Sequence, residues 1–372
     1  MINTTSRRKI EHLMICATNP VEARKVSAGF EDVTLIHRAL PELDMNKLDL
    51  SMDFLGKRLR APFMIASITG GHPDTIPVNS ALAAAAEELG VGIGVGSQRA
   101  AIDDPAQEES FRVVRDKAPN TFVYGNIGAA QIREYGTQGI EKLVEKIEKF
   151  VEMIDADALA IHLNFLQEAI QPEGDKDATG CLDAIREICS VLSTPVIVKE
   201  TGAGISREDA LLLQKAGVSA IDVGGVGGTS WAGVEVYRAR GSGDSTSEHI
   251  GELFWDFGIP TVASIIESRV SLPIIATGGV RTGLDIAKSL ALGASAASAA
   301  LPFVGSALEG KEAVVSTLSR MLNELKTAMF LCGCANIRDL RKAPVVVTGW
   351  TLEYLGQRGF NIKDYAMSRE VF

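Results

Sequence analysis

The chain has 372 residues, of which 46% are hydrophobic and 6% aromatic, and its formal net charge is −10. This composition suits one large barrel with insertions, while the acidic balance argues against nucleic acid as a partner and no run reaches the roughly 20 apolar residues of a membrane helix. Five cysteines, an odd count, argue against a disulfide framework and for a reducing cytoplasm.

A repeated pattern begins at Pro62, where each short apolar run is followed by a helical pattern. The runs that we interpret as strands are 62–67, 91–95, 121–126, 158–161, 195–198, 220–223, 273–276 and 295–298. The helical patterns that follow them are 79–89, 106–117, 139–153, 181–192, 207–216, 261–269, 284–292 and 311–331.

Eight such units predict an α/β fold, a single (β/α)8 TIM barrel at residues 62–349. Residues 1–61 are expected to be an N-terminal extension on the outside or rim, and residues 350–372 a C-terminal tail. A long insertion, 224–271, follows the sixth strand. A doubly wound open sheet could use similar units, but eight strands favour closure and no GxGxxG fingerprint opens the first unit.

The fourth strand ends in a cluster of polar side chains, which are His162, Asn164, Gln167 and Glu168. In a (β/α)8 barrel, the C-terminal ends of the strands build the active site. Glu168 is a hard oxygen ligand of the kind that Mg²⁺ takes. A polar loop that only caps a helix would have a similar composition, so this segment alone leaves both interpretations open.

Two glycine clusters follow late strands, GGVGGT at 224–229 and GGVR at 278–281, and the eighth strand ends at Ala300 and Leu301. Barrels often bind phosphate between the loops after strands seven and eight. Glycine lets backbone N–H groups approach phosphate, and a helix N-terminus adds a favourable dipole. The pattern predicts a phosphate site.

Other strand ends carry groups suited to a flat heteroaromatic cofactor. Lys199 ends the fifth strand, where it could stabilise an anionic reduced flavin or simply pair with Glu200. One polar group per strand end, pointing into one mouth, outlines the site, and the further candidates are Ser67, Ile68, Thr69, Gly70, Ser97 and Asn126.

The chain resembles the type 2, FMN-dependent isopentenyl-diphosphate delta-isomerases over nearly its whole length. The matching motifs are ASITGG (66–71), GVGSQRA (94–100), YGNIG (124–128), IHLNFLQEAIQPEGD (161–175), PVIVKE (195–200), GGVGGTSW (224–231), ATGGVRTGLDIAKSLALGA (276–294) and LRKAP (340–344). The resemblance implies interconversion of isopentenyl diphosphate and dimethylallyl diphosphate in isoprenoid biosynthesis, with reduced FMN, Mg²⁺ and no net redox change.

The resemblance also assigns site residues. Glu168 would bind Mg²⁺. The catalytic candidates Gln167, Lys199 and His162 are our own hypothesis from the chemistry, in which the reduced flavin is the acid-base device, Lys199 tunes its N1 and O2 edge and Gln167 orients the substrate or a water. The FMN contacts would be Ser67, Ile68, Thr69, Gly70, Ser97, Asn126, Lys199 and Thr229, with Gly279, Val280, Arg281, Ala300 and Leu301 at its phosphate. The substrate contacts would be Arg8, Lys9, Ser97, Gln98, Arg99, His162, Asn164 and Gln167.

The chemistry agrees with this assignment. A diphosphate needs local cations in an acidic chain, and arginine suits it because its planar fork donates two parallel hydrogen bonds. We expect Arg8 and Lys9 to lie in a segment that orders on binding, although a solvated N-terminal charge run is the commoner fate of such residues. His162 could instead be a general base, but its place beside the Mg²⁺ ligand favours diphosphate binding.

Two rival classes remain. An FMN-dependent oxidase or dehydrogenase of 2-hydroxy acids would use the same barrel, but it wants a base histidine in a late loop and no histidine follows His249. A non-enzymatic flavoprotein would leave Arg99, Gln167 and Glu168 without purpose. The family further implies NAD(P)H as reductant and a homotetramer or homo-octamer.

Overall fold

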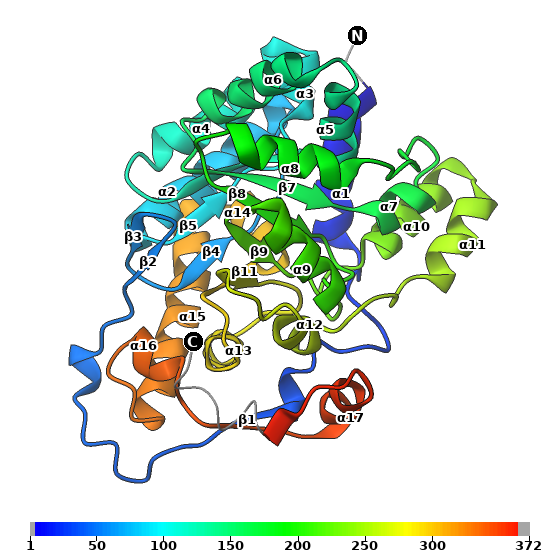
Figure 1. The fold of residues 1–372 in the computed structure, drawn as a ribbon. Coiled ribbons are helices and arrows are strands. Elements are labelled where there is room, and N and C mark those ends of the chain that lie inside the picture. Colours follow the sequence, from blue (N-terminus) through cyan, green and yellow to red (C-terminus); the bar gives the residue numbers. More distant parts are fainter. Residues whose placement is uncertain (1–3, 364–372) are drawn as a thin grey trace.

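Eight parallel strands form a closed barrel in the computed structural model, which describes residues 4–363 (Figure 1). The ladder runs in chain order from β4 to β11 and closes where β11 pairs with β4. The strands are apolar because both of their faces are buried, as in other parallel sheets. Their bounds are β4 (Phe63–Ile65), β5 (Gly92–Gly94), β6 (Val123–Gly128), β7 (Ala158–Leu163), β8 (Val196–Glu200), β9 (Ala220–Asp222), β10 (Ile274–Ala276) and β11 (Ala296–Ala299).

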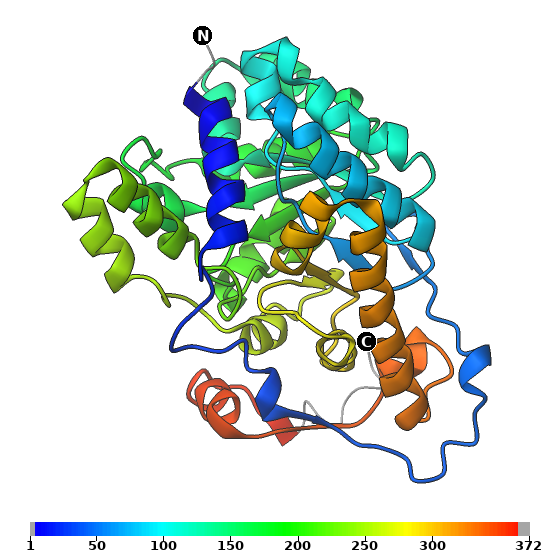
Figure 2. The ribbon, with the colours of Figure 1, turned by 180° about the vertical axis from the view of Figure 1, so that it is seen from behind.

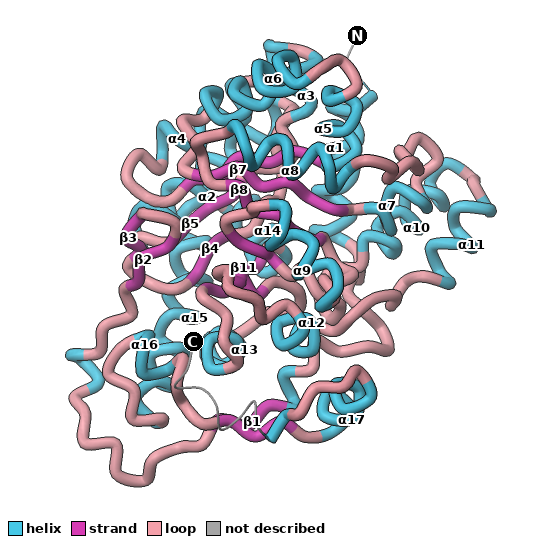
Figure 3. The backbone as a smooth tube through the Cα atoms, in the orientation of Figure 1, coloured by secondary structure: helices cyan, strands magenta, loops and turns pink. Residues whose placement is uncertain are grey.

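Helices form a layer around these strands, as Figure 3 shows. In α6, Leu143, Ile147 and Phe150 recur on one face and are buried, whereas the opposite face is charged. The layer comprises α2 (Ile76–Leu89), α4 (Glu109–Lys117), α5 (Ala129–Gly136), α6 (Ile140–Met153), α8 (Cys181–Val191), α9 (Arg207–Ala216), α12 (Thr261–Glu267), α13 (Gly283–Ala291), α14 (Leu301–Glu309) and α15 (Lys311–Leu331). Among the described helices, none has the length and apolar character that crossing a bilayer requires.

Each of the eight predicted strands is present, so the barrel is confirmed. After β11, the helix α14 begins at Leu301. The polar stretch in the insertion is helical, with α10 (Trp231–Ser242) and α11 (Ser245–Leu253) packed on each other. Both helices project from one side of the barrel in Figure 1. Short α3 (Arg99–Asp103) and α7 (Phe165–Ile170) follow β5 and β7.

The N-terminal end of the barrel is closed by a hairpin, β2 (Met52–Phe54) and β3 (Lys57–Leu59). Phe54 packs edge-on against Phe122, with ring centroids 5.4 Å apart. Phe54 and Leu59 belong to one buried cluster with inward-facing strand residues such as Met64 and Ile197. The barrel interior at this end is therefore a packed core rather than a pore.

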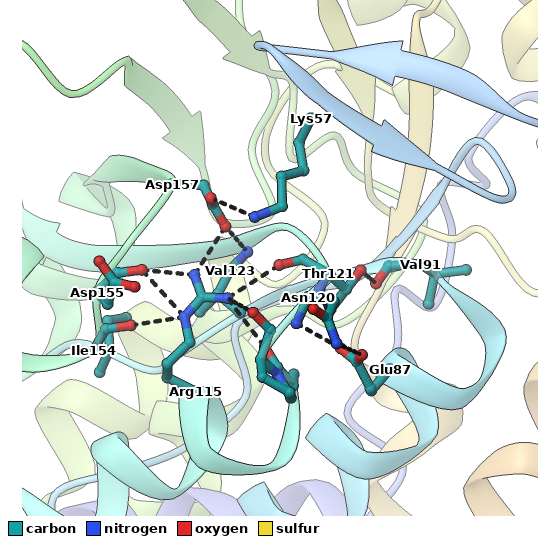
Figure 4. A network of polar contacts seen from close by, with 12 residues as sticks. Lys57, Glu87, Val91, Arg115, Asn120, Thr121, Val123, Ile154, Asp155 and Asp157 are labelled. Carbon is teal, nitrogen blue, oxygen red and sulfur yellow. Dashed lines mark hydrogen bonds and ion pairs between the residues drawn. The ribbon is translucent and has the colours of Figure 1, made fainter.

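A polar network lies at the same end, around Arg115 on α4 (Figure 4). Its guanidinium donates to the carbonyls of Ile154 (3.2 Å) and Asp155 (2.6 Å) and to the carboxylate of Asp157 (2.8 Å). Asp157 also accepts from Lys57 Nζ at 3.0 Å, so the network joins the hairpin to the outer layer. Arg115 thereby supplies hydrogen-bond donors to backbone carbonyls at the end of a helix and in the adjoining loops.

Segments from both ends of the chain cross the outside of the barrel. β1 (Val33–Leu35) pairs antiparallel with β12 (Val345–Val347). The helices α16 (Ile337–Leu340) and α17 (Gly349–Gln357) lie on either side of β12 in the chain. The N-terminal residues form α1 (Thr4–Thr18), which contacts both α14 and α10 and is the dark-blue helix of Figure 2.

Candidate active site

One cavity opens at the C-terminal ends of the strands and gathers residues from nearly every strand-to-helix loop. The helix α1 forms one wall, through Arg8, Lys9, His12, Leu13 and Cys16. The predicted site residues that line this cavity are Arg8, Lys9, Ser67, Ile68, Ser97, Arg99, Asn126, His162, Asn164, Gln167, Glu168, Lys199, Thr229, Gly279, Val280, Arg281, Ala300 and Leu301.

Three predicted residues, Thr69, Gly70 and Gln98, do not line the cavity. Gln98 is fully buried, because its Nε2 donates to the Phe150 carbonyl at 2.9 Å and its Oε1 accepts from Asn126 N at 2.9 Å. Gly70 packs against the Phe111 ring, where a side chain would collide. Thr69 is buried, and its carbonyl accepts from Gly96 N at 2.9 Å. These residues support the cavity wall from behind.

Lys199 lies in the cavity floor and is only 7% exposed. Its Nζ donates to the carbonyl of Glu200 at 2.7 Å and lies 3.9 Å from Asp222 Oδ2. The Glu200 carboxylate accepts instead from the backbone N–H groups of Thr201 and Gly202, each at 2.6 Å. The alternative in which Lys199 merely pairs with the Glu200 carboxylate is therefore wrong.

His162 stands beside Asn126, with its Nδ1 2.8 Å from Asn126 Oδ1. The amide nitrogen of Asn126 donates to the Val95 carbonyl, so Asn126 Oδ1 is the acceptor and His162 Nδ1 carries the proton. Burial, together with the charges of Lys199 and Lys9, lowers the pKa of His162 to about 3. The ring is neutral near pH 7, and Nε2 is left as an acceptor.

The cavity narrows toward the loops after β9 and β10. A Cβ on Gly228 would lie 2.4 Å from Gly279 N, so only glycine permits this close approach of two backbones. The N-terminus of α14 borders the same space, and its cap residue Ala300 supplies no side-chain hydrogen bond. Free N–H groups at a helix N-terminus suit a phosphate. Arg281 also lines this space, where its backbone N–H donates to Asp285 and its guanidinium pairs with Glu22.

The mouth of the cavity carries three cations, Arg8, Lys9 and Arg99. Burial and the charges of Arg8 and Arg99 lower the pKa of Lys9 to about 8. Part of this lowering comes from repulsion between neighbouring positive charges. A bound polyanion would compensate these charges and raise the pKa of Lys9 again.

Three functional candidates were missed in the sequence, His12, Trp231 and Glu235. Glu235 is 2% exposed and accepts from Gln167 Nε2 at 2.8 Å, and it lies 3.1 Å from His12 Nε2. The His12 ring packs edge-on against Trp231, with centroids 5.2 Å apart. Helical spacing was the available signal, since His12 follows Arg8 by four residues and Glu235 follows Trp231 by four.

Glu235 is ionised despite its burial. Burial opposes its charge, but the contacts with His12, Arg238 and Gln167 outweigh that cost and lower its pKa to about 2. Arg238 binds Glu235 at 2.6 Å, Glu173 at 2.7 Å and Glu11 at 3.5 Å. Arg238 thus joins α1, α10 and the loop after α7 at the edge of the cavity.

Glu168 is the only carboxylate among the predicted site residues, and within residues 4–363 no group of three or more His, Cys, Asp or Glu side chains could hold a metal ion. Its Oε1 accepts from Asn164 at 2.9 Å and its Oε2 from Asp175 N at 2.8 Å. Mg²⁺ is commonly held by one or two carboxylates plus substrate phosphates and water. The donor set fits an ion of that kind that arrives with its substrate.

The chain matches the family model described as FMN-dependent dehydrogenase over residues 3–120 and 130–347. It is 82% identical to the isopentenyl-diphosphate delta-isomerase of Methanosarcina barkeri over 372 residues, which is 100% of both chains. It is 54% identical to that of Archaeoglobus fulgidus over 356 residues, or 96% of this chain and 100% of that one. The chain belongs to the type 2 isopentenyl-diphosphate delta-isomerases.

Solved structures similar to this isomerase share its fold. A lactate oxidase of Pediococcus acidilactici matches with a TM-score of 0.61 at 17% identity, covering 88% of this chain and 89% of that chain. A mandelate oxidase matches with a TM-score of 0.60 at 18% identity, covering 92% of this chain and 98% of that chain. At such identities the likeness shows the barrel alone.

Proposed function

We propose that this isomerase interconverts isopentenyl diphosphate and dimethylallyl diphosphate with reduced FMN and Mg²⁺, without net redox change. The observation that carries the proposal is a single cavity with a polar floor for a flavin and a mouth that holds Arg8, Lys9 and Arg99 beside Glu168. An acidic chain that concentrates cations around one carboxylate is suited to a magnesium diphosphate.

The cavity residues fit FMN. Ser67 Oγ is buried without a hydrogen-bond partner among residues 4–363, and Ser67 lines the cavity floor. The residues that would contact the ring are Ser67, Ile68, Ser97, Asn126, Lys199 and Thr229. The phosphate would lie against the N-terminus of α14 and the glycine loop, at Gly279, Val280, Ala300 and Leu301. Lys199 would place its charge at the N1 and O2 edge of the ring.

The substrate diphosphate would bind at the mouth, between α1 and the loop after β7. Glu168 would hold Mg²⁺ together with diphosphate oxygens, and Arg8, Lys9 and Arg99 would neutralise the remaining charge. His162 would bind the diphosphate only after its Nε2 takes a proton. A His162→Gln variant that loses turnover while keeping substrate affinity would instead assign His162 to proton transfer.

Shifting a double bond requires a proton to be added at one carbon and removed from another, and reduced FMN supplies an N5 position for this chemistry when bound. Gln167 would orient the substrate over the ring, because Glu235 fixes its amide. Lys199 would tune the electronics of the ring edge. With pre-reduced FMN, we expect Gln167→Ala and Lys199→Ala each to lose at least roughly a hundredfold in turnover, the range typical of acid-base groups. Unchanged turnover would reject these roles.

The rival activity is oxidation of a 2-hydroxy acid, as the names of the structural neighbours, lactate oxidase and mandelate oxidase, suggest for those proteins. That chemistry wants a base histidine in a late loop, but the histidines that line the cavity are His12 and His162. The test incubates reduced enzyme with isopentenyl diphosphate and Mg²⁺, and oxidised enzyme with lactate and an electron acceptor. Product in the second mixture alone would overturn the proposal.

Two accompanying expectations belong to this function. We infer that NAD(P)H reduces the bound FMN, which anaerobic bleaching of the flavin absorbance on addition of NADH or NADPH would test. We also infer a homotetramer or homo-octamer, supported by the exposed apolar side chains Leu253 and Phe257 in the insertion. Light scattering on the purified protein would measure the mass, and a monomer would contradict this assembly.

A further inference from the structure

Asp222 is a buried carboxylate that the reaction described above does not use. It ends β9, directly beside Lys199 on β8, and the two residues are partners in the parallel ladder. Asp222 is 1% exposed, and its Oδ2 lies 3.9 Å from Lys199 Nζ. A charge buried this deeply is costly unless it is paired, so Lys199 is the main compensation that the structure offers.

Glu200, the other acidic residue next to Lys199, does not pair with the lysine in this way. Glu200 follows Lys199 in the chain, but its carboxylate accepts N–H groups from Thr201, Gly202 and Ala203 and thereby shapes the loop after β8. Burial raises the pKa of Glu200 to about 7. Asp222 is therefore the carboxylate that faces the lysine charge.

The polar groups around Asp222 lie near the floor of the cavity. Burial raises the pKa of Asp222, while the charge of Lys199 and hydrogen bonds from the Thr277 side chain and the Gly224 backbone oppose that rise. Burial and the charge of Asp222 raise the pKa of Tyr124, so that phenol stays protonated. Gly94 gives the Tyr124 ring its space, because a Cβ there would lie 2.2 Å from the ring. This layer lies beneath Lys199 and between it and the packed core.

We propose that Asp222 is a positioning residue that holds Lys199 at the floor of the cavity and moderates the positive charge that Lys199 presents to the flavin edge. The inference rests on the proposed function, because it takes Lys199 to be the residue beside the ring. A lone lysine would favour the anionic reduced flavin strongly. A lysine balanced by a carboxylate 3.9 Å away favours it less. Asp222 would thus set the ratio of anionic to neutral reduced FMN available for proton transfer.

The experiment compares holoenzyme variants by their FMN midpoint potential and by the absorbance spectrum of the reduced flavin across pH. For Asp222→Asn we expect a more positive potential and a ratio of anionic to neutral reduced flavin that rises roughly tenfold, which is one pKa unit. For Lys199→Met we expect the opposite direction in both. In a Lys199→Met background, Asp222→Asn should shift either quantity by much less, because Asp222 acts through the lysine.

The outcomes distinguish a failure of the proposed role of Lys199 from a failure of the inference about Asp222. If Lys199→Met leaves the potential unchanged, the proposed place of Lys199 at the ring edge fails. If Lys199→Met shifts the potential and Asp222→Asn does not, the inference about Asp222 fails while the function stands. If Asp222→Asn binds no FMN, Asp222→Ser replaces it, and a potential equal to wild type together with unchanged spectra in that uncharged variant would also overturn the role of Asp222.

Discussion

Lys9 must be protonated to attract the substrate diphosphate, but it loses its proton more easily than an ordinary lysine. Its pKa in the free protein is lowered to about 8 by burial and by Arg8 and Arg99. Below pH 8 the ammonium is present, and above pH 8 it is progressively lost. We therefore expect kcat/KM to fall above pH 8, by up to about tenfold per pH unit.

The matched variant for this prediction is Lys9→Arg, whose guanidinium stays protonated throughout this range. Its kcat/KM profile, measured with pre-reduced enzyme, should lose the alkaline fall near pH 8. A profile with the same fall as wild type would assign that titration to a different group.

His162 presents the opposite case, a ring that must gain a proton to become a donor. Because its pKa in the free protein is lowered to about 3, the ring is neutral at pH 6.5. A diphosphate beside Nε2 raises that pKa, since an anion favours the charged form of histidine. We expect inorganic diphosphate with Mg²⁺ to bind with uptake of about one proton at pH 6.5.

Calorimetry in two buffers of different ionisation enthalpy measures this uptake. The His162→Gln variant keeps a hydrogen-bonding side chain but cannot titrate. Diphosphate binding to this variant should therefore take up fewer protons than binding to the wild type. Equal proton uptake in both proteins would show that His162 stays neutral in the complex.

At the scale of elements, α1 is fastened over the cavity by Arg238. This arginine reaches Glu235 on its own helix, Glu173 in the loop after α7, and Glu11 on α1. Arg238→Met should keep the aliphatic stem but release these carboxylates. We expect KM for isopentenyl diphosphate to rise roughly tenfold with a smaller change in kcat, as loss of binding rather than of chemistry predicts.

The control for Arg238 lies two residues later on the same helix, facing away from it. Arg240 pairs with Glu248 and Glu252 on α11 at 2.7 Å each, and no ion pair joins it to the described residues of α1. Arg240→Met should therefore leave KM near wild type. Equal effects from both substitutions would mean that α10 itself has been disturbed.

The elements also show what could be predicted from sequence. Strands and outer helices follow from periodicity, because each buries one face or both, and the motif residues at strand ends converge as the barrel requires. The path of α1 could not be predicted, since charged residues such as Arg8 and Lys9 look solvated until a distant loop covers them. Gln98 was misplaced for a related reason: adjacent residues in a tight loop point in opposite directions, and only packing against Phe150 decides which one enters the core.

Across the whole molecule, the two ends of the barrel divide their tasks. The C-terminal end gathers the cavity, and the N-terminal end holds the hairpin and the network around Arg115. Because of this division, a substitution at the N-terminal end should lower stability but leave catalysis nearly unchanged. Arg115→Ala removes the side-chain donor from several carbonyls and one of the donors to Asp157, which keeps Lys57 and Val123 N, at a cost of about 2–3 kcal/mol.

We expect Arg115→Ala to lower the thermal midpoint clearly while kcat/KM at 25 °C stays within about twofold of wild type, since each kcal/mol shifts the midpoint of a large domain by a few degrees. Arg112→Ala is the control, because Arg112 lies on the same helix and makes only a 3.8 Å exposed pair with Glu108. A large loss of kcat/KM in Arg115→Ala would show that the two ends are coupled.

The pairing of β1 with β12 has a consequence for how the protein is made. The early strand leaves the ribosome long before its partner, so the extension that carries α1 stays unanchored while the strands of the barrel are synthesised. The barrel can close first, and the N-terminal lid settles only after Val345–Val347 emerges and captures it. A nascent chain halted before β12 would accordingly fold its core yet leave its catalytic mouth uncovered.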